Sequence, residues 1–553
     1  MLKWNAKYDR KVQKMLFWGV LCLFGVCMAQ VRPMRKHRTT PVKNPTKVFL
    51  LHADELSYNQ ILKPDAQLLK GKVHFRQDNV HMYCDSAYYY EKSNSFEAYK
   101  NVKMQQGDTL FLYGDYLHYD GNTQMAFVRM NVKLINRKTV LTTDSLNYDR
   151  LYNIGYFIEG GTLTDEQNVL TSDWGEYSPS TKVAVFNYNV KLVNPKFTLT
   201  SDTLRYSTAT KTANIVGPSN IDSKENHIYS ESGFYNTDKE QGILLNRSVW
   251  TNGEKRMVGD SLYYDRKKGY GEGFRNVILS DKKNKNMLTG DYCYYNEKTG
   301  YALATKKAVA IDYSQPDSAY LHADSLKMFT YNINTDSVYR KMLAYRKVRM
   351  YKKDVQAVCD SMSYNTKDSC LTMYYNPILW NQGQQLFGEE IRAYANDSTI
   401  DWAHIINQAT SIEQKDSLHY NQVTGKEMKI YFQKGTVEHT DVIGNVQVVY
   451  YPLDEDSTMI GMNTSVTSQL SVFMKDKKVH KMIMKPQSNG TLYPMLQIPK
   501  DKMYIPIFAW FDYIRPLNKN DIFEWRGKKA GQELKKTERR EVPLQNLDKL
   551  KGD

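Results

Sequence analysis

The sequence predicts an all-β fold in which two sheets face each other across a shared apolar interior. Three observations indicate it: a short phrase recurs along most of the chain, apolar and polar residues alternate within it, and turn signals separate the copies. The phrase is an acid, a small residue, an aliphatic residue, any residue and a tyrosine, as in Asp144-Ser145-Leu146-Asn147-Tyr148. Such a repeat predicts a stacked array.

The copies of this phrase define about thirteen repeats, and several neighbouring copies are 29 residues apart. Strong copies begin at Asp54, Asp115, Asp144, Asp202, Asp260, Asp324, Asp360 and Asp416, and weaker copies begin at Asp85, Asp173, Glu231, Asp291 and Glu389. The spacing widens between Asp260 and Asp360, where we place a break between two parts of the array, 48–305 and 306–425.

Each repeat is expected to supply two amphipathic strands, one to each sheet. Asp144, Leu146 and Tyr148 share one face of an extended strand, which we expect to point inward. A second phrase follows in most repeats, as in Asn131-Val132-Lys133-Leu134, and is again apolar on one face. Turn signals such as Asp120-Gly121-Asn122 favour tight antiparallel reversals.

The N-terminus reads as a secretory signal peptide over residues 1–29. Five basic residues precede an apolar run from Met15 to Ala29, with small residues before Gln30. The alternative is an uncleaved anchor, but this run is shorter than the roughly 20 residues that a spanning helix needs. Neither Cys22 nor Cys27 has the small-residue context of a lipid-attachment site. We therefore expect an exported protein.

The net charge of +15 does not indicate a nucleic-acid binder, because the charge lies in the flanks. Six basic and no acidic residues occupy 31–47, within a predicted basic linker at 30–47, and nine basic against five acidic residues occupy a charged tail at 526–553. A nucleic-acid binder would place its basic residues on the folded face that follows the phosphates. No nucleic-acid partner is expected.

Signatures of catalysis, cofactors and metal sites are missing from the sequence. It contains no nucleophile elbow, zinc-protease helix or phosphate-binding loop. Four cysteines follow the signal, at 84, 293, 359 and 370, and none forms a Cys-x-x-Cys pair. A bridge between Cys359 and Cys370 stays an alternative, as does a calcium ladder for the recurring Asp. We favour an Asp that accepts backbone hydrogen bonds where each strand begins.

Two repeats have glycine where the others have an aliphatic residue, at Gly175 and Gly233. Loss of core volume there would leave room for hydrocarbon, whereas the alternative is that these glycines mark bulges or a close approach of strands. The segment 426–525 keeps alternating but loses the phrase and ends rich in Pro and aromatics. It is expected to cap the array, and a docking region for a partner or a membrane surface is the alternative.

The Ala/Gly-Asp-Ser-Leu-x-Tyr strands, such as Gly259-Asp260-Ser261-Leu262-Tyr263-Tyr264, followed by Asn-Val-x-Leu strands, resemble the OstA-like family of lipopolysaccharide-transport proteins over roughly residues 48–425. The resemblance implies an elongated β-jelly roll that holds lipopolysaccharide acyl chains inside. It also implies other jelly-roll modules and an outer-membrane barrel as partners. After residue 425 too little chain remains for such a barrel in this sequence.

The leading hypothesis is therefore a non-enzymatic periplasmic lipopolysaccharide-transport protein without cofactor or metal, associated with outer-membrane assembly. The predicted lipid-binding interior is Leu117, Tyr119, Val132, Leu134, Leu146, Tyr148, Gly175, Val190, Leu192, Leu204, Tyr206, Gly233, Leu262, Tyr264, Val277 and Leu279. One alternative is a structural or adhesive extracytoplasmic repeat protein with a packed core and no lipid. Another is a polysaccharide-binding or degrading solenoid with an exposed aromatic and carboxylate cleft.

Overall fold

The computed structural model describes residues 46–534, apart from 62, 382, 397–399, 434, 455, 457, 477 and 533. The predicted signal peptide at 1–29, almost all of the linker at 30–47 and most of the tail at 526–553 lie outside the described residues. The described chain divides into two compact units. Unit 1 comprises the described chain up to Glu159 together with the short segment Ser178–Ser180. Unit 2 comprises Gly160–Tyr177 and the described chain from Thr181 onward.

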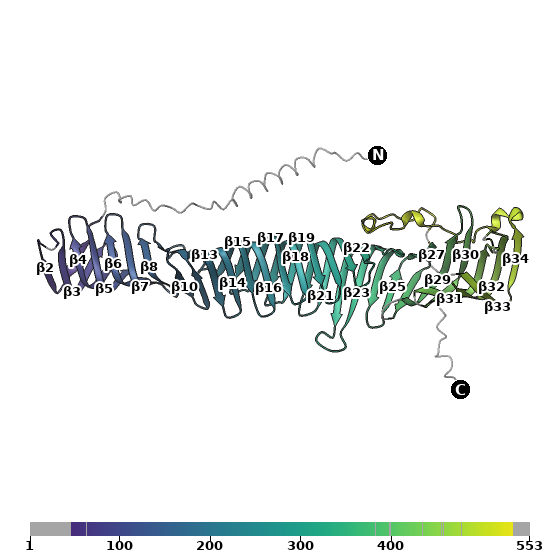
Figure 1. Ribbon diagram of the computed structural model, residues 1–553, viewed down its shortest axis with the longest axis horizontal. Coiled ribbons are helices and arrows are strands. Elements are labelled where there is room, and N and C mark those ends of the chain that lie inside the picture. The colour runs from purple at the N-terminus through teal and green to yellow at the C-terminus, as the bar shows by residue number, and fades with distance from the viewer. Residues whose placement is uncertain are drawn as a thin grey trace, which may run out of the picture. The chain divides into compact units, whose positions relative to one another are not determined.

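Both units are antiparallel β-structures (Figure 1). The strands of unit 1 are β1 (Phe49–His52), β2 (Glu55–Tyr58), β3 (Gln67–Gln77), β4 (Val80–Tyr90), β5 (Ser95–Gln106), β6 (Leu110–Asp120), β7 (Met125–Asn136), β8 (Thr139–Asp149) and β9 (Ile154–Phe157).

The elements of unit 2 continue the numbering. They are β10 (Gly161–Asp165), β11 (Asn168–Ser172), β12 (Trp174–Ser178), β13 (Val183–Asn194), β14 (Phe197–Ser207), β15 (Thr212–Asp222), β16 (Asn226–Asn236), β17 (Gln241–Asn252), β18 (Lys255–Asp265), β19 (Tyr270–Asp281), β20 (Asn286–Asn296), β21 (Tyr301–Asp312), β22 (Ala319–Tyr331), β23 (Tyr339–Tyr351), β24 (Val355–Asn365), β25 (Cys370–Tyr374), β26 (Ile378–Asn381), β27 (Gln384–Phe387), β28 (Glu390–Ala395), β29 (Ile400–Gln414), β30 (Tyr420–Gln433), β31 (Thr436–Tyr450), β32 (Gly461–Lys475), β33 (Lys478–Lys485), β34 (Asn489–Pro494) and the short 3-10 helices η1 (Met495–Gln497), η2 (Lys500–Lys502), η3 (Asp512–Ile514) and η4 (Asp521–Phe523).

Consecutive long strands pair with each other through tight turns, as the sequence predicts. In unit 2, β14 pairs with β13 and β15, and β18 pairs with β17 and β19, all antiparallel. The prediction of two strands for each repeat is confirmed, since the Asp260 phrase lies on β18 and the Asn276 phrase on β19. The assignment of one strand to each of two sheets is wrong, because neighbouring strands are hydrogen-bonded to each other on both sides of a central bend.

A two-residue bulge produces this bend in the middle of alternate strands. In β19, Arg275 and Asn276 both have left-handed backbone angles, with φ of 59° and 47°, and the register with β18 shifts at this point. Asn tolerates this conformation better than most residues. The side-chain amide of Asn276 donates a hydrogen bond to Asp260 Oδ2 at 2.9 Å.

The same contact joins the two sequence phrases in other repeats, with donor–acceptor distances from 2.6 to 2.8 Å. The pairs are Asn101–Asp85, Asn131–Asp115 and Asn189–Asp173. In these repeats the recurring acid therefore lies opposite a bulge in mid-strand, and the prediction that it accepts backbone hydrogen bonds where the strand begins is wrong for them. Because the bulge changes the alternation, Asp144 is exposed whereas Leu146 and Tyr148 are buried.

The bend folds each sheet onto itself, so that one sheet supplies both layers. In unit 1, Phe75 is the neighbour of Met82 on β4, and Phe96 is the neighbour of Tyr89 on the same strand. Seven residues of extended strand span about 23 Å. Nevertheless, the Phe75 and Phe96 rings stack with their centroids 4.2 Å apart.

Unit 2 has the same geometry. Trp250 is the neighbour of Met257 on β18, yet its ring lies 6.0 Å from that of Tyr264, seven residues further along the strand. We name the strand halves that end at turns such as Asn252–Lys255 arm A, the halves that end at turns such as Asp265–Tyr270 arm B, and the line where these two rows of turns meet the mouth. The apolar core lies between the arms.

Two copies of the phrase do not occupy the predicted position. Leu56 and Tyr58 are 55% and 57% exposed, because β2 lies at the edge of the sheet and has β3 as its partner. The copy at Asp416 lies in the turn between β29 and β30, where Asp416 accepts from the backbone amides of Leu418 and His419 at 2.8 Å. Leu418 is accordingly 60% exposed.

The expected break at 305–306 is not seen in the structure. Strand β21 runs through these residues, and Lys306 and Lys307 form the same left-handed bulge as in other repeats. The spacing widens because β22 and β23 have 13 residues each and are joined by a longer turn (Figure 1). The repeat is thus lengthened here but not interrupted.

The end of the predicted C-terminal segment 426–525 covers a face of the sheet and not the end of the array. Residues 426–494 continue through β30 to β34, and we call the following residues, 495–526, the strap. The strap contacts β30 at Met503, β27 at Ala509 and β23 at Ile514, so it runs back across the strands. It packs on the outer side of arm A in unit 2.

Buried glutamines of the sheet hold the backbone of the strap. Gln385 Nε2 donates to Ala509 O at 2.8 Å, and its Oε1 accepts from Phe511 N at 2.7 Å. Gln422 makes the same pair of bonds with Met503 O and Ile505 N. An outer apolar cluster joins the strap to the sheet: Ala509, Phe511 and Ile514 of the strap pack on Val358, Ile378, Trp380, Phe387, Ile412 and Tyr420.

Candidate functional site

The apolar interior between the arms is where the structure places the predicted site residues. All of them are buried: Leu117, Tyr119, Val132, Leu134, Leu146 and Tyr148 in unit 1, and Gly175, Val190, Leu192, Leu204, Tyr206, Gly233, Leu262, Tyr264, Val277 and Leu279 in unit 2. Each unit therefore has an apolar interior to which both arms contribute.

The interior side chains pack against one another. Leu134, Leu146, Leu192 and Leu204 have 0% exposure, whereas Leu279 is 8% exposed. Hydrocarbon would enter this part of the interior only if the arms moved apart, because close-packed side chains leave no room for a further chain. The elements that hold the mouth closed therefore decide what the interior can accept.

The glycine at 233 does not provide free volume. A Cβ atom at Gly233 would lie 2.4 Å from the carbonyl oxygen of Ile243 on the neighbouring strand β17. Its φ of 154° is also unusual for residues with a side chain. The close approach of two strands, the alternative reading of this glycine, is therefore confirmed, and the prediction of extra room at Gly233 is wrong.

The tyrosine of the repeat phrase closes the mouth in unit 1. Tyr119, at the arm B end of β6, donates its hydroxyl to Gln77 Oε1 at the arm A end of β3. Arg150 Nη1 also donates to Gln77 Oε1, at 2.8 Å, and to the Tyr119 hydroxyl. Burial raises the pKa of Tyr119 to about 12, so the phenol stays protonated and remains a donor.

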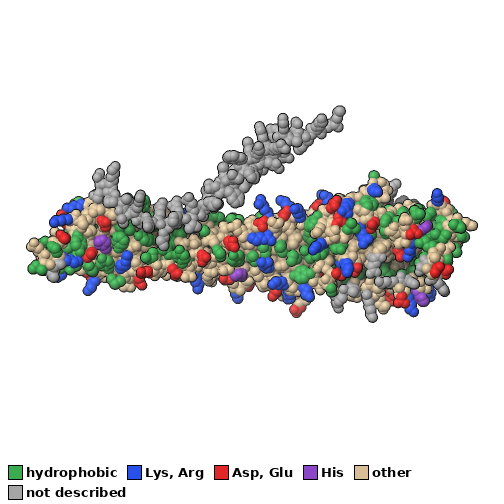
Figure 2. Space-filling model, turned by 45° about the horizontal axis from the view of Figure 1, so that its top comes forward, with side chains coloured by type: hydrophobic (Ala, Val, Ile, Leu, Met, Phe, Trp, Pro, Cys, Tyr) green, Lys and Arg blue, Asp and Glu red, His purple; other side chains and the backbone are tan. Residues whose placement is uncertain are grey.

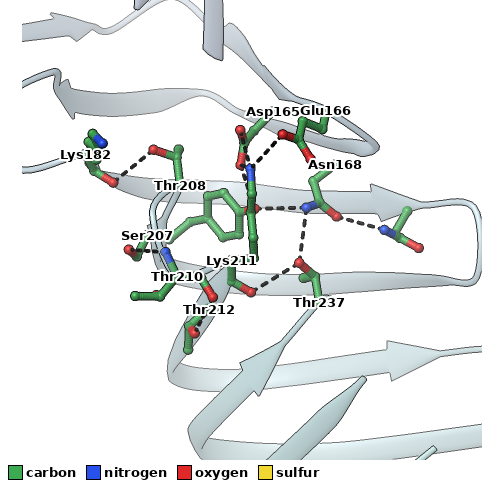
Figure 3. A network of polar contacts seen from close by, with 12 residues as sticks. Asp165, Glu166, Asn168, Lys182, Ser207, Thr208, Thr210, Lys211, Thr212 and Thr237 are labelled. Carbon is green, nitrogen blue, oxygen red and sulfur yellow. Dashed lines mark hydrogen bonds and ion pairs between the residues drawn. The ribbon is translucent and has the colours of Figure 1, made fainter. Parts of the chain in front are cut away.

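The same closure is seen in unit 2, where Figure 3 shows the polar network around Asn168 and Lys211. The Tyr206 hydroxyl donates to Asp165 Oδ2 at 2.9 Å and accepts from Asn168 Nδ2 at 2.9 Å. Asn168 Nδ2 also donates to Thr237 Oγ1 at 3.1 Å, and Lys211 Nζ lies 2.7 Å from Asp165 Oδ2. Asp165 and Asn168 belong to an arm A turn, whereas Tyr206, Lys211 and Thr237 belong to arm B.

Further polar contacts bridge the mouth along unit 2. Asn226 Nδ2 donates to the Tyr264 hydroxyl at 3.0 Å. The carboxylate of Glu240, at an arm B turn, binds Lys196 of an arm A turn and Arg266. Burial opposes ionisation of Glu240, but the two cations outweigh it and lower its pKa. We refer to these tyrosine, asparagine and charged contacts together as the latches.

Sequence reasoning found the latching tyrosines but placed them among the lining residues. Their acceptors and donors were missed, because Asp165, Asn168 and Asn226 lie at strand ends and read as ordinary turn residues. A signal was nevertheless present, since Tyr206 and Tyr264 each follow their asparagine by 38 residues.

Among the described residues, no group of three His, Cys, Asp or Glu side chains is arranged to hold a metal ion, and no helix is long and apolar enough to cross a membrane. Cys84, Cys293, Cys359 and Cys370 are free and buried, so the alternative of a Cys359–Cys370 bridge is wrong. Burial raises the pKa of the Cys293 thiol to about 12. Figure 2 shows basic and acidic side chains interspersed on the face that it displays.

The first repeats of the chain match a known protein family. Residues 45–202 match the model of a family described as OstA-like protein. No curated protein matches the chain. Among solved structures, the chain is similar to the crystal structure of LptH, the LptA homologous periplasmic component of the lipopolysaccharide transport device from Pseudomonas aeruginosa. That similarity has 15% identity and a TM-score of 0.19, and covers 22% of this chain and 82% of LptH.

The family model covers β1 to β13 and the first half of β14, and with them the contacts Asn101–Asp85, Asn131–Asp115 and Asn189–Asp173 and the Tyr119 latch. Both sequence phrases that resemble the family thus have a structural role here, at the bulge and at the mouth. Over residues 45–202, the chain is thus similar in sequence to the OstA-like family.

Proposed function

We propose that this protein transports lipopolysaccharide across the periplasm, with the acyl chains held between arm A and arm B. The observation that carries the proposal is the apolar interior, formed from both arms and shielded from solvent by the latches. The family match over residues 45–202 supports it. Other jelly-roll modules and an outer-membrane barrel are the proposed partners, and no catalytic step is proposed.

Shielding of acyl chains follows from the hydrophobic effect. Each methylene group moved from water into an apolar interior contributes about 0.8 kcal/mol. The two arms meet along a mouth that side-chain contacts close, whereas the bend is made of continuous backbone. Separation of the arms would therefore break latches such as Tyr206–Asp165 without breaking a strand. The interior would open along the mouth and close again behind the cargo.

Photocrosslinking in cells tests the proposal. A photoreactive residue is placed in turn at the inward positions Leu146, Leu204 and Leu262, and at the outward positions Ser145 and Ser261 as controls. Lipopolysaccharide adducts at the inward positions alone are expected. An exported and folded protein that gives no adduct at any position would contradict transport and favour the alternative, a structural repeat protein with a permanently packed core.

A further inference from the structure

One repeat of unit 2 lacks the tyrosine of the phrase, and a cavity lies at this position, flanked by the Lys255–Tyr295 and Asn252–Glu297 contacts between the arms. In the repeat that begins at Asp324, the phrase reads Asp324-Ser325-Leu326-Lys327-Met328, so methionine replaces the tyrosine. Met328 and Asn286 occupy the same places in their repeats as Tyr264 and Asn226. Both line a cavity of about 330 Å³. The methionine has no hydroxyl with which to bridge the arms.

The walls of this cavity belong to the interior. Leu279 of β19 and Leu288 of β20 are paired neighbours on arm A, and Met328 of β22 lies on arm B. Leu279 is one of the predicted lining residues and is 8% exposed, whereas Leu204 and Tyr206 are 0% exposed. The turn between β22 and β23 adds Ile333 and Val338. The cavity therefore lies at the mouth, beside the apolar interior of the roll.

Charged groups surround the apolar walls. Lys255, Asp281, Glu297 and Arg340 line the same cavity. Lys255 Nζ donates to the Tyr295 hydroxyl and lies 4.8 Å from the centre of that ring. An apolar cavity with polar groups at its rim suits an amphiphile, because the chain is buried while the head group keeps polar partners.

The volume sets the size of the occupant. Ligand cavities in proteins span roughly 300–1,000 Å³. At about 30 Å³ for each water-sized group, a cavity of 330 Å³ holds roughly ten such groups, and a methylene group is of similar size. One alkyl chain fits, whereas the several chains of a multiply acylated lipid do not fit together.

We propose that this cavity, which we name the Met328 portal, is the point where one acyl chain of a lipid passes between the outside and the interior of the roll. The inference rests on the proposed function and names where its cargo crosses the mouth. It also gives the Tyr-to-Met change in this repeat a physical role.

The purified full chain, titrated with a dansyl-labelled undecanoic acid, tests the portal directly. Saturable binding to the wild type is expected. Met328→Tyr, which restores the phrase and fills the cavity, is expected to weaken binding at least tenfold. Phe329→Tyr, which places the same residue on the outer face one position away, is the matched control. Val338→Trp narrows the rim from an exposed turn and is expected to weaken binding even if Met328→Tyr folds poorly.

Equal binding by the wild type and by folded Met328→Tyr and Val338→Trp would overturn the portal. So would a folded wild type that shows no saturable binding.

Crosslinking in cells separates this inference from the proposed function. A photoreactive residue at Val338 is expected to give a lipid adduct that Met328→Tyr abolishes, and the mass of the adduct identifies the lipid. Adducts at Leu204 but none at Val338 would overturn the portal and leave transport standing. Saturable binding in vitro and an adduct of another lipid at Val338, with no lipopolysaccharide adduct anywhere, would support the acyl-chain site and contradict lipopolysaccharide as the cargo.

Discussion

The strands β13 to β21 and the strands β22 to β32, both in unit 2, share one inner face but differ on the outer face of arm A. In the first group, this outer face carries Thr198, Thr200 and His227, none of which is buried. In the second group, Val358, Trp380 and Phe387 occupy the outer face and are buried under the strap. The repeat phrase does not specify the residues on the outer face. Their polarity decides whether another segment must cover that face.

The strap itself depends on this difference. Its backbone amides and carbonyls would be costly to bury without partners. Gln385 and Gln422 provide donor and acceptor pairs on the outer face. Arg349 is fully buried there, donates to Ile514 O at 3.2 Å and lies 3.5 Å from Asp521. An apolar outer face with amide side chains is thus a sequence signal for a covering segment.

The largest expected effect comes from removal of the aromatic anchor of the strap. Phe511 is buried against Phe387, and Phe511→Ala should cost about 3–5 kcal/mol through the lost contacts and the cavity left behind. Native-state hydrogen exchange should show loss of protection in β24 to β30 while β13 to β21 keep theirs. Phe523→Ala, at a strap residue that is 46% exposed, is the control. Equal loss of protection in both groups of strands would contradict an independent strap layer.

The next largest effect concerns a latch of the first group. Tyr206→Phe keeps the ring but removes the hydroxyl that contacts Asp165 and Asn168, so buried polar groups lose a partner at a cost of about 1–3 kcal/mol. We expect faster hydrogen exchange of the Asp165–Asn168 turn and of the arm B ends of β14 and β16. Tyr331→Phe, on a ring that is 40% exposed, should change little. A Tyr206→Phe protein with unchanged exchange would show that the arms are held together by the apolar interior alone.

Loss of the bulge contact in the first group should have a smaller effect. Asn276→Ala removes the bond to Asp260 and places alanine at a φ of 47°, which should destabilise β18 and β19 by about 1 kcal/mol. Asn276→Gly accepts the left-handed conformation and should recover part of the loss. Urea unfolding monitored by local exchange measures both variants. Equal loss in the two variants would assign the effect to the side-chain bond and not to the backbone.

The smallest effect is a pH dependence of the Lys196–Glu240–Arg266 latch. The two cations lower the pKa of Glu240 below its ordinary value of 4.5. This latch therefore contributes fully above about pH 4.5, and its contribution is lost as pH falls through the lower, folded-state pKa. Glu240→Gln should flatten the acid-side decrease of local stability around β17 and β18. An identical acid profile in wild type and variant would exclude this carboxylate as its cause.

The all-β class, the two strands for each repeat and the buried interior could be predicted because they are local. Alternation of Leu146 and Tyr148 with polar neighbours, and a 29-residue spacing, depend on nothing distant in the chain. The position of Asp144 was mispredicted for the same reason. A bulge changes the register of one strand against its neighbour, and a single strand read by itself does not reveal that partner.

The bend, the latches and the strap were decided only by the tertiary structure, because they involve residues that are far apart in sequence. The bend folds one sheet into two layers, because left-handed pairs such as Arg275 and Asn276 recur at one level of the sheet. The latches join turns about 40 residues apart, and the strap returns across strands more than 80 residues before it. The sequence by itself thus determined which side chains are apolar and how often they recur. Long-range pairing determined which of them meet, and therefore where side-chain contacts seal the interior.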